Sequence, residues 1–458
     1  MRMVIIAMGL GVLLGLPWMG LAEDVGPAAG PDVQDIIDDR VRVGAATGIV
    51  VGIIRKDGRR EFYSVGTMQS NSTTAVDEDT IFEIGSISKV FTTLMAAQME
   101  AAGTLQMSDP VQQYLPEGVT MPAREGTVIT LEHLATHTSG LPRLPDNFKP
   151  EDPANPYACY TYQQLYDFLS SHELAGPVGG DGSYSNLGTA LLGHVLERRS
   201  GKSYGDLLFV EVCEPLGMSS TTTTPRESEA RRVAGGHVGG QPTSAWDFPT
   251  FAGAGGIKST ARDMLVFTAA NLGQIDTPMV DVMRHCHEPR VGTGRSGTRI
   301  GLGWHVQGPP GREITWHNGG TGGFASFLGI RKDTGEGVVV LSNSAYRGVD
   351  QVGLHLLDSE NTLYDYPDEI TIDPAKFKDY VGVYQISPNY ALTVKFEEGR
   401  LLVELTGQNF LEVYPTATDE FSYRDVEARL EFLRGAYDQV DRLVLHQGGR
   451  QMGATKLE

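Results

Sequence analysis

The chain of 458 residues has little cysteine: Cys159, Cys213 and Cys286 are the only ones, and they lie far apart. Three separated cysteines permit at most one disulfide and match no zinc-binding spacing, which excludes a disulfide framework. Basic residues are also scarce, since 37 Lys and Arg face 57 Asp and Glu, giving a formal net charge of −20. The acidic residues are spread along the chain, which argues against nucleic acid or an anionic lipid surface as a partner.

Long hydrophobic runs are missing beyond the N-terminus. Arg2 precedes an apolar stretch that ends at Gly20-Leu21-Ala22, the pattern of a secretory signal peptide cleaved before Glu23. Pro17 disfavours a permanent membrane helix, and no later segment is long and apolar enough to span a bilayer. We therefore expect residues 1–22 to be a signal peptide and the mature protein to be exported, either periplasmic or secreted, with no stable membrane span.

A metal-binding cluster is also lacking. His133 and His137 lie four residues apart, but Glu132 precedes the first histidine instead of following it as in the zinc-protease motif. His285-Cys286-His287 has no second cluster of ligands nearby. The sequence therefore predicts no metal and no cofactor, and we interpret His133 and His137 as a structural pair.

The most informative segment that is present covers residues 82–89, Phe-Glu-Ile-Gly-Ser-Ile-Ser-Lys. It sets Ser86 and Lys89 three residues apart where a helix is predicted to begin, so that both side chains share one face of the first turn. A lysine kept away from water can lose its charge and take the proton of a serine nucleophile. Taken alone, the pair also fits an ordinary helix start with Ser86 as the N-cap.

Two later segments carry polar side chains in turn-like surroundings. Tyr184-Ser185-Asn186 follows a glycine-rich turn and precedes an apolar helix, so Tyr184 and Asn186 are expected to project from a loop into a cleft. Residues 316–324 contain four glycines, which allow a strand edge to approach a substrate backbone closely. Residues 201–205 fit the Gly-x-Ser-x-Gly elbow of other hydrolases, but a helical pattern precedes them, so Ser203 is expected to start the next helix.

In this order and spacing, the three segments resemble the motifs of the serine β-lactamase and penicillin-binding hydrolase superfamily. The motifs are most similar to those of the class C β-lactamase branch. Residues 82–89 match the active-site signature of that branch at every position. Further stretches resemble loops of the same family, at residues 136–142, 255–260 and 301–304. The resemblance covers about residues 35–350.

The resemblance implies an acyl-enzyme mechanism. Ser86 would be the acylated nucleophile, Lys89 its proton partner, and Tyr184 a second base whose pKa is lowered by neighbouring lysine charge. Asn186 would bind a substrate amide, and the backbone N–H groups of Ser86 and Gly320 would form the oxyanion hole. Which of Lys89 and Tyr184 acts in each step stays open.

One departure concerns the substrate. The third motif of true β-lactamases usually reads Lys-Thr-Gly, with the lysine helping to hold a carboxylate, whereas this chain has His317-Asn318-Gly319. A histidine is a weaker anion anchor near pH 7, and it can also merely cap a strand end. Similar His-x-Gly forms occur in relatives that resemble D-aminopeptidases, DD-peptidases and esterases. The resemblance thus implies that His317, Gly319 and Gly320 line the substrate site together with Asn186.

We predict a serine hydrolase of the class C β-lactamase or DD-peptidase type. It would form an acyl-enzyme on Ser86 and act on an amide carbonyl, either of a β-lactam or of a D-amino-acid peptide of the cell-wall type. An esterase of small acyl esters is the alternative within this chemistry. A non-hydrolysing penicillin-binding or sensor protein is an alternative of another class, which the presence of Ser86, Lys89 and Tyr184 argues against.

The expected fold class is α+β with two domains. In residues 23–365 the resemblance implies an antiparallel sheet flanked by helices, together with an all-α subdomain. Residues 48–55 and 61–66 are strand-like runs on either side of a turn at Lys56-Asp57-Gly58, which predicts a hairpin. Residues 372–458 show short alternating runs separated by turns, which predict a small antiparallel β-barrel-like domain that resembles a lipocalin-like module. We favour a barrel filled by side chains and packed beside the cleft over one that binds a ligand.

Overall fold

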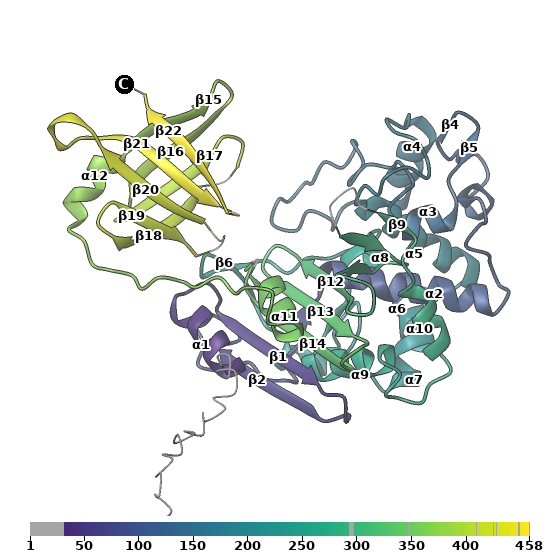
Figure 1. The fold of residues 1–458 in the computed structure, drawn as a ribbon. Coiled ribbons are helices and arrows are strands. Elements are labelled where there is room, and N and C mark those ends of the chain that lie inside the picture. The colour runs from purple at the N-terminus through teal and green to yellow at the C-terminus, as the bar shows by residue number, and fades with distance from the viewer. Residues whose placement is uncertain are drawn as a thin grey trace, which may run out of the picture.

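A computed structural model describes residues 32–292, 297–346, 348–408, 410–424, 426, 428–447 and 449–457, so the expected signal peptide lies outside the described residues. It shows an N-terminal α+β domain and a C-terminal β-barrel, joined by an extended segment after residue 357 (Figure 1). Within the described ranges, no helix combines the length and the apolarity needed to cross a membrane.

An eight-stranded antiparallel sheet forms the centre of the N-terminal domain, in the order β2-β1-β14-β13-β12-β11-β10-β9. The predicted hairpin is confirmed, and its first strand pairs with a strand from the far end of the domain. The strands are β1 (Gly48–Ile54), β2 (Arg60–Gly66), β9 (Val291–Gly292), β10 (Thr298–Ile300), β11 (His305–Gln307), β12 (Ile314–Gly320), β13 (Ala325–Arg331) and β14 (Glu336–Ser342).

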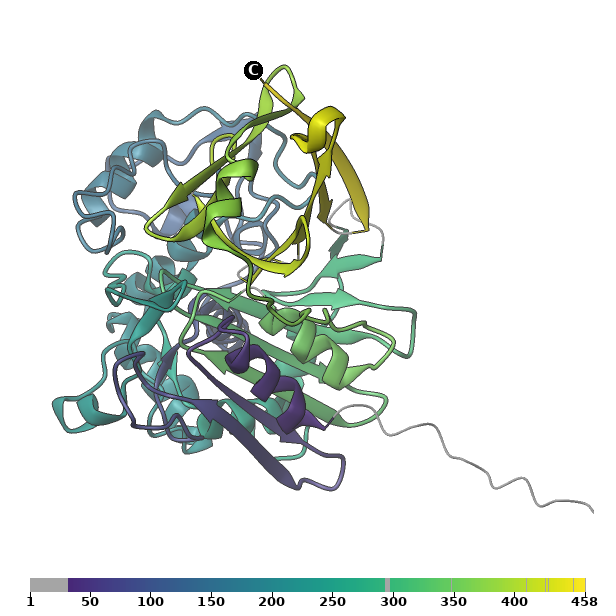
Figure 2. The same ribbon diagram turned by 90° about the vertical axis from the view of Figure 1, so that its left-hand side faces the viewer.

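Helices cover both faces of this sheet, which explains why β1 is apolar throughout. Val50 and Ile54 point into one hydrophobic core, whereas Val51 and Ile53 point into the other. One face carries the first and last helices of the domain, which lie together in front of the sheet in Figure 2. These are α1 (Val33–Arg42) and α11 (Val349–Leu357), and the opposite face carries α2 (Ser88–Ala101) and α9 (Ala261–Asn271).

A mainly helical region fills the middle of the chain. Its helices are α3 (Leu131–Ala135), α4 (Tyr162–Ser171), α5 (Asn186–Ser200), α6 (Tyr204–Leu208), α7 (Glu214–Leu216), α8 (Ala252–Gly255) and α10 (Val280–Cys286). Three two-stranded sheets accompany them: β3 (Phe82–Glu83) with β8 (Lys258–Ser259), β4 (Ala123–Arg124) with β5 (Thr127–Val128), and β6 (Gly236–Val238) with β7 (Gln241–Thr243). As predicted, Ser203 begins a helix, since its hydroxyl caps α6 by accepting the Asp206 N–H at 3.2 Å.

The C-terminal domain is a closed antiparallel barrel. Its interior is filled by side chains, among which Tyr380, Tyr384, Phe421 and Phe432 are fully buried, so the expectation of a filled barrel is confirmed. The elements are α12 (Phe377–Tyr380), β15 (Gly382–Ser387), β16 (Tyr390–Glu397), β17 (Arg400–Leu405), β18 (Leu411–Ala417), β19 (Glu420–Tyr423), β20 (Ala428–Arg434), β21 (Val440–Gln447) and β22 (Arg450–Lys456).

The barrel contacts the linker, and the linker in turn contacts α1 through Arg42 and Asp368. The Ile370 N–H donates to the Pro415 carbonyl at 2.8 Å, and Arg424 pairs with Glu369. A cavity of about 250 Å³ separates this face of the barrel from Arg42 and Val43. These contacts place the described barrel interface at α1 and the linker.

Candidate active site

Ser86 lies in a tight turn just before a helix. The turn is the 3₁₀ segment η1 (Gly85–Ile87), and α2 begins at Ser88, slightly later than the sequence indicated. Lys89 still comes within reach of the serine because it occupies the first turn of α2. Its Nζ lies 2.9 Å from Ser86 Oγ and donates a hydrogen bond to the Ala254 carbonyl at 2.6 Å.

Two glycines let the serine turn lie directly against the end of β12. Gly85 has a φ of +50°, and a Cβ there would meet the Gly320 nitrogen at 2.6 Å. A Cβ on Gly319 would meet the Ile84 carbonyl oxygen at 2.0 Å. Both positions therefore require glycine for the backbone to approach this closely. The result is that Gly320, at the end of its strand, lies beside Ser86.

Lys89 is buried without a charged partner. Its side chain is 0 % exposed, and burial lowers its pKa well below the ordinary value, with a further lowering by the nearby Arg143 charge. Desolvation acts in this direction because it penalises the ammonium form. The lowered pKa favours the neutral amine, which is the form that can accept the proton of the neighbouring hydroxyl.

The Tyr184 ring also lies close to the Lys89 amine. It immediately precedes Ser185, whose hydroxyl caps α5, and Lys89 Nζ lies 4.9 Å from the centre of its ring. Burial raises the pKa of Tyr184 to about 12, although a hydrogen bond with Ser86 and the Arg143 charge act in the other direction. The direction at this site is thus opposite to the lowered tyrosine pKa that the family resemblance implies, because burial outweighs the influences that favour the phenolate.

His137 holds the segment on both sides of Tyr184. Its carbonyl accepts the Ser183 N–H at 2.8 Å, and its ring Nδ1 accepts the Ser185 N–H at 3.2 Å. The His137 and Tyr184 rings lie 4.6 Å apart, and the backbone of His137 adopts a φ of +61°. Burial first, then nearby positive groups beginning with Lys89, lowers the pKa of His137 to about 3. The ring therefore stays neutral and keeps Nδ1 as an acceptor.

The third motif lies on β12, where the centre of the His317 ring is 6.2 Å from that of Tyr184. His317 is 1 % exposed, its Nδ1 lies 2.5 Å from the Asn318 carbonyl oxygen, and its Nε2 is buried without a described partner. Burial lowers the pKa of His317 well below its ordinary value, so it carries no charge at neutral pH. The Asn318 side chain donates to Asp350 at 2.6 Å, away from Ser86. The motif therefore presents only Gly320 to the pocket.

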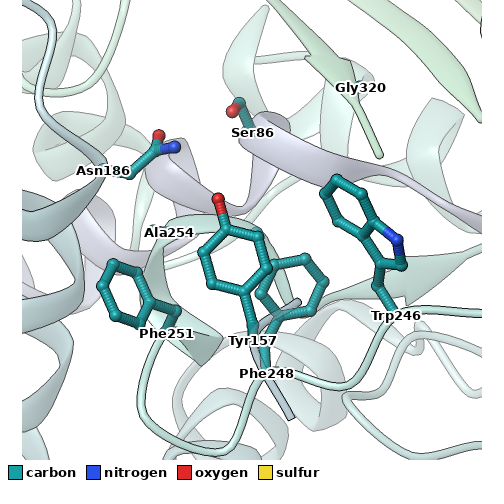
Figure 3. Close-up of a pocket in the computed structure, with 9 residues that line it drawn as sticks. Ser86, Tyr157, Asn186, Trp246, Phe248, Phe251, Ala254 and Gly320 are labelled. Carbon is teal, nitrogen blue, oxygen red and sulfur yellow. The ribbon is translucent and has the colours of Figure 1, made fainter. Parts of the chain in front are cut away.

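A narrow pocket of about 20 Å³ opens beside Ser86 (Figure 3). Asn186 and Gly320 line it, whereas His317 and Gly319 do not. Asn186 Oδ1 is buried and has no described partner, so it is free to accept a hydrogen bond from a ligand. The rest of the wall is largely aromatic and carries no charged side chain, being formed by Tyr157, Trp246, Phe248, Phe251, Ala254 and Gly255.

The sequence interpretation missed His137 as a neighbour of Tyr184 and missed the aromatic wall. The stretch at residues 136–142 had signalled a family loop, but a spacing of four residues directed attention to His133 as its partner. The two histidines stabilise different segments. His133 Nδ1 accepts the Thr130 N–H at 3.1 Å in the N-terminal cap of α3, whereas His137 binds the segment around Tyr184. Five of the six wall residues lie within residues 246–255, so the closely spaced aromatics Trp246, Phe248 and Phe251 were a signal that could have been read. Tyr157 lies about 90 residues earlier in the chain, and only the fold brings it to the same wall.

Comparisons with known proteins identify the family of this chain. The β-lactamase family model matches residues 33–360. The chain belongs to the β-lactamase family. Two relatives are the D-alanyl-D-alanine-carboxypeptidase/endopeptidase AmpH of Escherichia coli K12, 32% identical over 69% of this chain and 84% of that protein, and penicillin-binding protein 4* of Bacillus subtilis, 27% identical over 86% and 91%. Membership of this family makes the protein a serine hydrolase.

Solved structures support the same fold. A class C β-lactamase from Rhodobacter sphaeroides is 27% identical and aligns with 72% of this chain and 98% of its own, with a TM-score of 0.63. A β-lactamase/D-alanine carboxypeptidase from Yersinia pestis is 26% identical, with coverages of 72% and 98% and the same TM-score of 0.63. Residues 366–456, which contain the barrel, match a family described as a domain of unknown function, DUF3471.

Proposed function

We propose that Ser86 is the nucleophile of an amide-cleaving acyl-enzyme cycle, with a β-lactam or a D-amino-acid peptide of the cell-wall type as substrate. The observation that carries this proposal is the 2.9 Å contact between Ser86 Oγ and the buried amine of Lys89. The similarity to a D-alanyl-D-alanine-carboxypeptidase/endopeptidase and to a penicillin-binding protein supports this substrate class over a simple ester. The esterase remains the second candidate, because the mechanism activates ester carbonyls equally well.

The first half of the cycle acylates the serine. Lys89 takes the Ser86 proton while Oγ forms a bond to the substrate carbonyl carbon, and the backbone N–H groups of Ser86 and Gly320 stabilise the oxyanion. The carbon–nitrogen bond then breaks. The departing nitrogen receives a proton from Tyr184, which is replenished from the Lys89 ammonium, so that the serine proton ends on the leaving amine.

The second half releases the acyl group. Lys89 or the Tyr184 oxygen accepts a proton from water as the water oxygen attacks the acyl carbon, and the Oγ–carbon bond breaks with return of a proton to Ser86. The resting pKa directions favour Lys89 as the base and Tyr184 as the proton donor in acylation. The free Oδ1 of Asn186 would accept the N–H of a substrate amide.

The wider setting proposed for this chemistry is an exported protein. Residues 1–22 would be removed as a signal peptide, residues 23–365 would form the hydrolase domain, and residues 372–458 would form a lipocalin-like module. Substrates on the outer side of a cell membrane, such as cell-wall peptides or β-lactams, fit this location. No barrel residue lines the described Ser86 pocket, which supports a structural role for the barrel.

The test is intact mass spectrometry of the mature protein after incubation with a fluorescent penicillin, with hydrolysis of nitrocefin and p-nitrophenyl acetate measured in parallel. Ser86→Ala is the decisive variant. Ser203→Ala is the matched control, because it removes a serine with a hydrolase-like sequence context whose role is to cap α6.

The outcomes separate the candidates. A penicillin adduct that Ser86→Ala abolishes and Ser203→Ala retains supports peptidase-like chemistry, and rapid nitrocefin turnover without a lasting adduct supports a β-lactamase. Ester cleavage that depends on Ser86, with neither adduct nor lactam turnover, would favour the esterase. Absence of all three activities would contradict the proposal and favour the non-hydrolysing sensor.

A further inference from the structure

The pocket lacks the positive charge that the third motif supplies in true β-lactamases. His317 is buried and neutral, and the Asn318 side chain is engaged with Asp350. No residue that lines the Ser86 pocket carries a charge. A substrate carboxylate bound here therefore needs a cation from outside the pocket wall.

Arg143 supplies a cation at the edge of this site. Its guanidinium carbon lies 5.1 Å from the centre of the Tyr184 ring, on an exposed side chain. Its backbone is fixed, because its carbonyl accepts the N–H of Asn186 at 3.1 Å and that of Leu187 at 3.2 Å. Arg143 therefore lies on the side of the pocket formed by Asn186, across from Gly320.

The charge of Arg143 is available to a ligand. Over the described ranges of the chain, the Arg143 guanidinium forms no ion pair, whereas most other arginines are paired with carboxylates. Its field reaches the reacting groups, since after burial it is the second influence that lowers the pKa of Lys89. An arginine guanidinium also matches a carboxylate in geometry, because it can donate two parallel hydrogen bonds.

We propose that Arg143 binds a carboxylate on the acyl half of the substrate, at the Asn186 side of the Ser86 pocket. This inference rests on the proposed function and specifies its substrate class as anionic. Asn186 would hold the substrate amide while Arg143, three residues beyond Gly140 in the preceding loop, holds the negative charge. The site thus obtains its anion anchor from the loop before α5 and not from β12.

The test uses two p-nitrophenyl esters that differ only in charge, namely mono-p-nitrophenyl adipate and its methyl ester. The ratio of their kcat/KM values is measured for the wild type, Arg143→Gln and Arg143→Lys. Arg442→Gln, in the barrel, is the matched control for loss of one exposed arginine. The ratio cancels any effect of Arg143 on Lys89 that both esters share.

We expect the wild type to favour the charged ester by about 10- to 100-fold, the range of a charge-assisted hydrogen bond. Arg143→Gln should abolish this preference mainly through KM, Arg143→Lys should keep part of it, and Arg442→Gln should leave it unchanged. Added salt should weaken the preference. A wild type with no preference, or an equal loss on both esters in Arg143→Gln, would overturn the inference while Ser86-dependent hydrolysis still upheld the proposed function. Hydrolysis that does not depend on Ser86 would count against both.

Discussion

The N-terminal domain and the barrel differ in how many polar side chains they bury. The N-terminal domain buries many, including Glu83, Lys89 and His317, and several of these have no charged partner. In the described part of the barrel, Ser422 is the sole buried polar side chain, and charges such as Arg434 with Asp419 pair at the surface. Burying a polar group without a hydrogen-bond partner costs stability, and in the described residues Asn186 Oδ1 and His317 Nε2 are two such groups near Ser86 and Tyr184. The N-terminal domain thus gives up some stability at its candidate site.

The largest effect is expected from Lys89→Met, which replaces the buried amine by an apolar side chain of similar length. Loss of the proton acceptor should lower kcat/KM for p-nitrophenyl acetate by about 10²- to 10⁴-fold. The free energy of unfolding should not fall, because the substitution removes a desolvated amine. Lys395→Met in the barrel, which breaks the exposed pair with Glu397, is the control and should leave activity unchanged. Full activity of Lys89→Met would refute the assignment of the base.

The reverse experiment weakens the barrel and leaves the active site intact. Phe421→Ala removes a fully buried ring from the barrel core and should cost about 3–5 kcal/mol of that domain's stability. The rate of Ser86 acylation should stay unchanged, because no barrel residue lines the described pocket. Urea titration by circular dichroism reports the loss. Tryptophan fluorescence reports the other domain separately, since residues 372–458 contain no tryptophan. A parallel fall in acylation would show that the domains act as one unit.

Substitutions of His137 test whether this buried side chain supports activity by positioning Tyr184. His137→Leu removes the Nδ1 acceptor of the Ser185 N–H and should lower kcat by about 10²-fold by displacing Tyr184, with little change in KM. His137→Asn offers an amide oxygen in place of Nδ1 and tolerates the positive φ, so it should recover most of the activity. Equal losses in both variants would contradict a positioning role. The pH profile of kcat provides an independent measurement of displaced proton transfer.

The smallest expected effect is a difference between the two domains in how mild acid changes their free energy of unfolding. Burial lowers the folded-state pKa of His137 to about 3 from an ordinary value of 6.5. Below pH 6.5 the unfolded chain therefore binds more protons at this histidine than the folded protein does. Stability is complete above pH 6.5 and declines as pH falls, by about 2 kcal/mol at pH 5 from this histidine alone. His317, whose pKa burial also lowers, acts in the same direction.

The barrel should not respond over the same pH interval. In the barrel, the half-buried carboxylate of Asp419 has a pKa below its ordinary value of 3.8, mainly because of its hydrogen bond with Arg434. Its contribution to stability is therefore lost only in stronger acid. Tryptophan-detected urea midpoints at pH 7 and pH 5 should therefore differ, whereas a barrel signal from circular dichroism should not. An unchanged tryptophan midpoint would mean that His137 is not desolvated in the folded protein.

Local patterns predicted most of the fold. The hairpin of β1 and β2 and the β-strand character of residues 372–458 match the sequence expectations, because both depend on the polarity of neighbouring residues. The pairing of β1 with β14 could not be read from periodicity, since the partners Ile49 and Ser342 lie almost 300 residues apart. The start of α2 was off by a short turn because helix ends depend on local capping.

The sequence by itself determined which reactive groups are present and how they are spaced: a serine and a lysine one helical turn apart, a tyrosine before a helix, and a histidine in place of a lysine. Only the tertiary structure decided their chemical states. Burial lowers the pKa of Lys89 and of His317 well below their ordinary values and raises the pKa of Tyr184 to about 12. Arg143, beside Tyr184, stays exposed. Protonation depends on solvent exclusion by residues distant in the chain, and no local spacing encodes that exclusion.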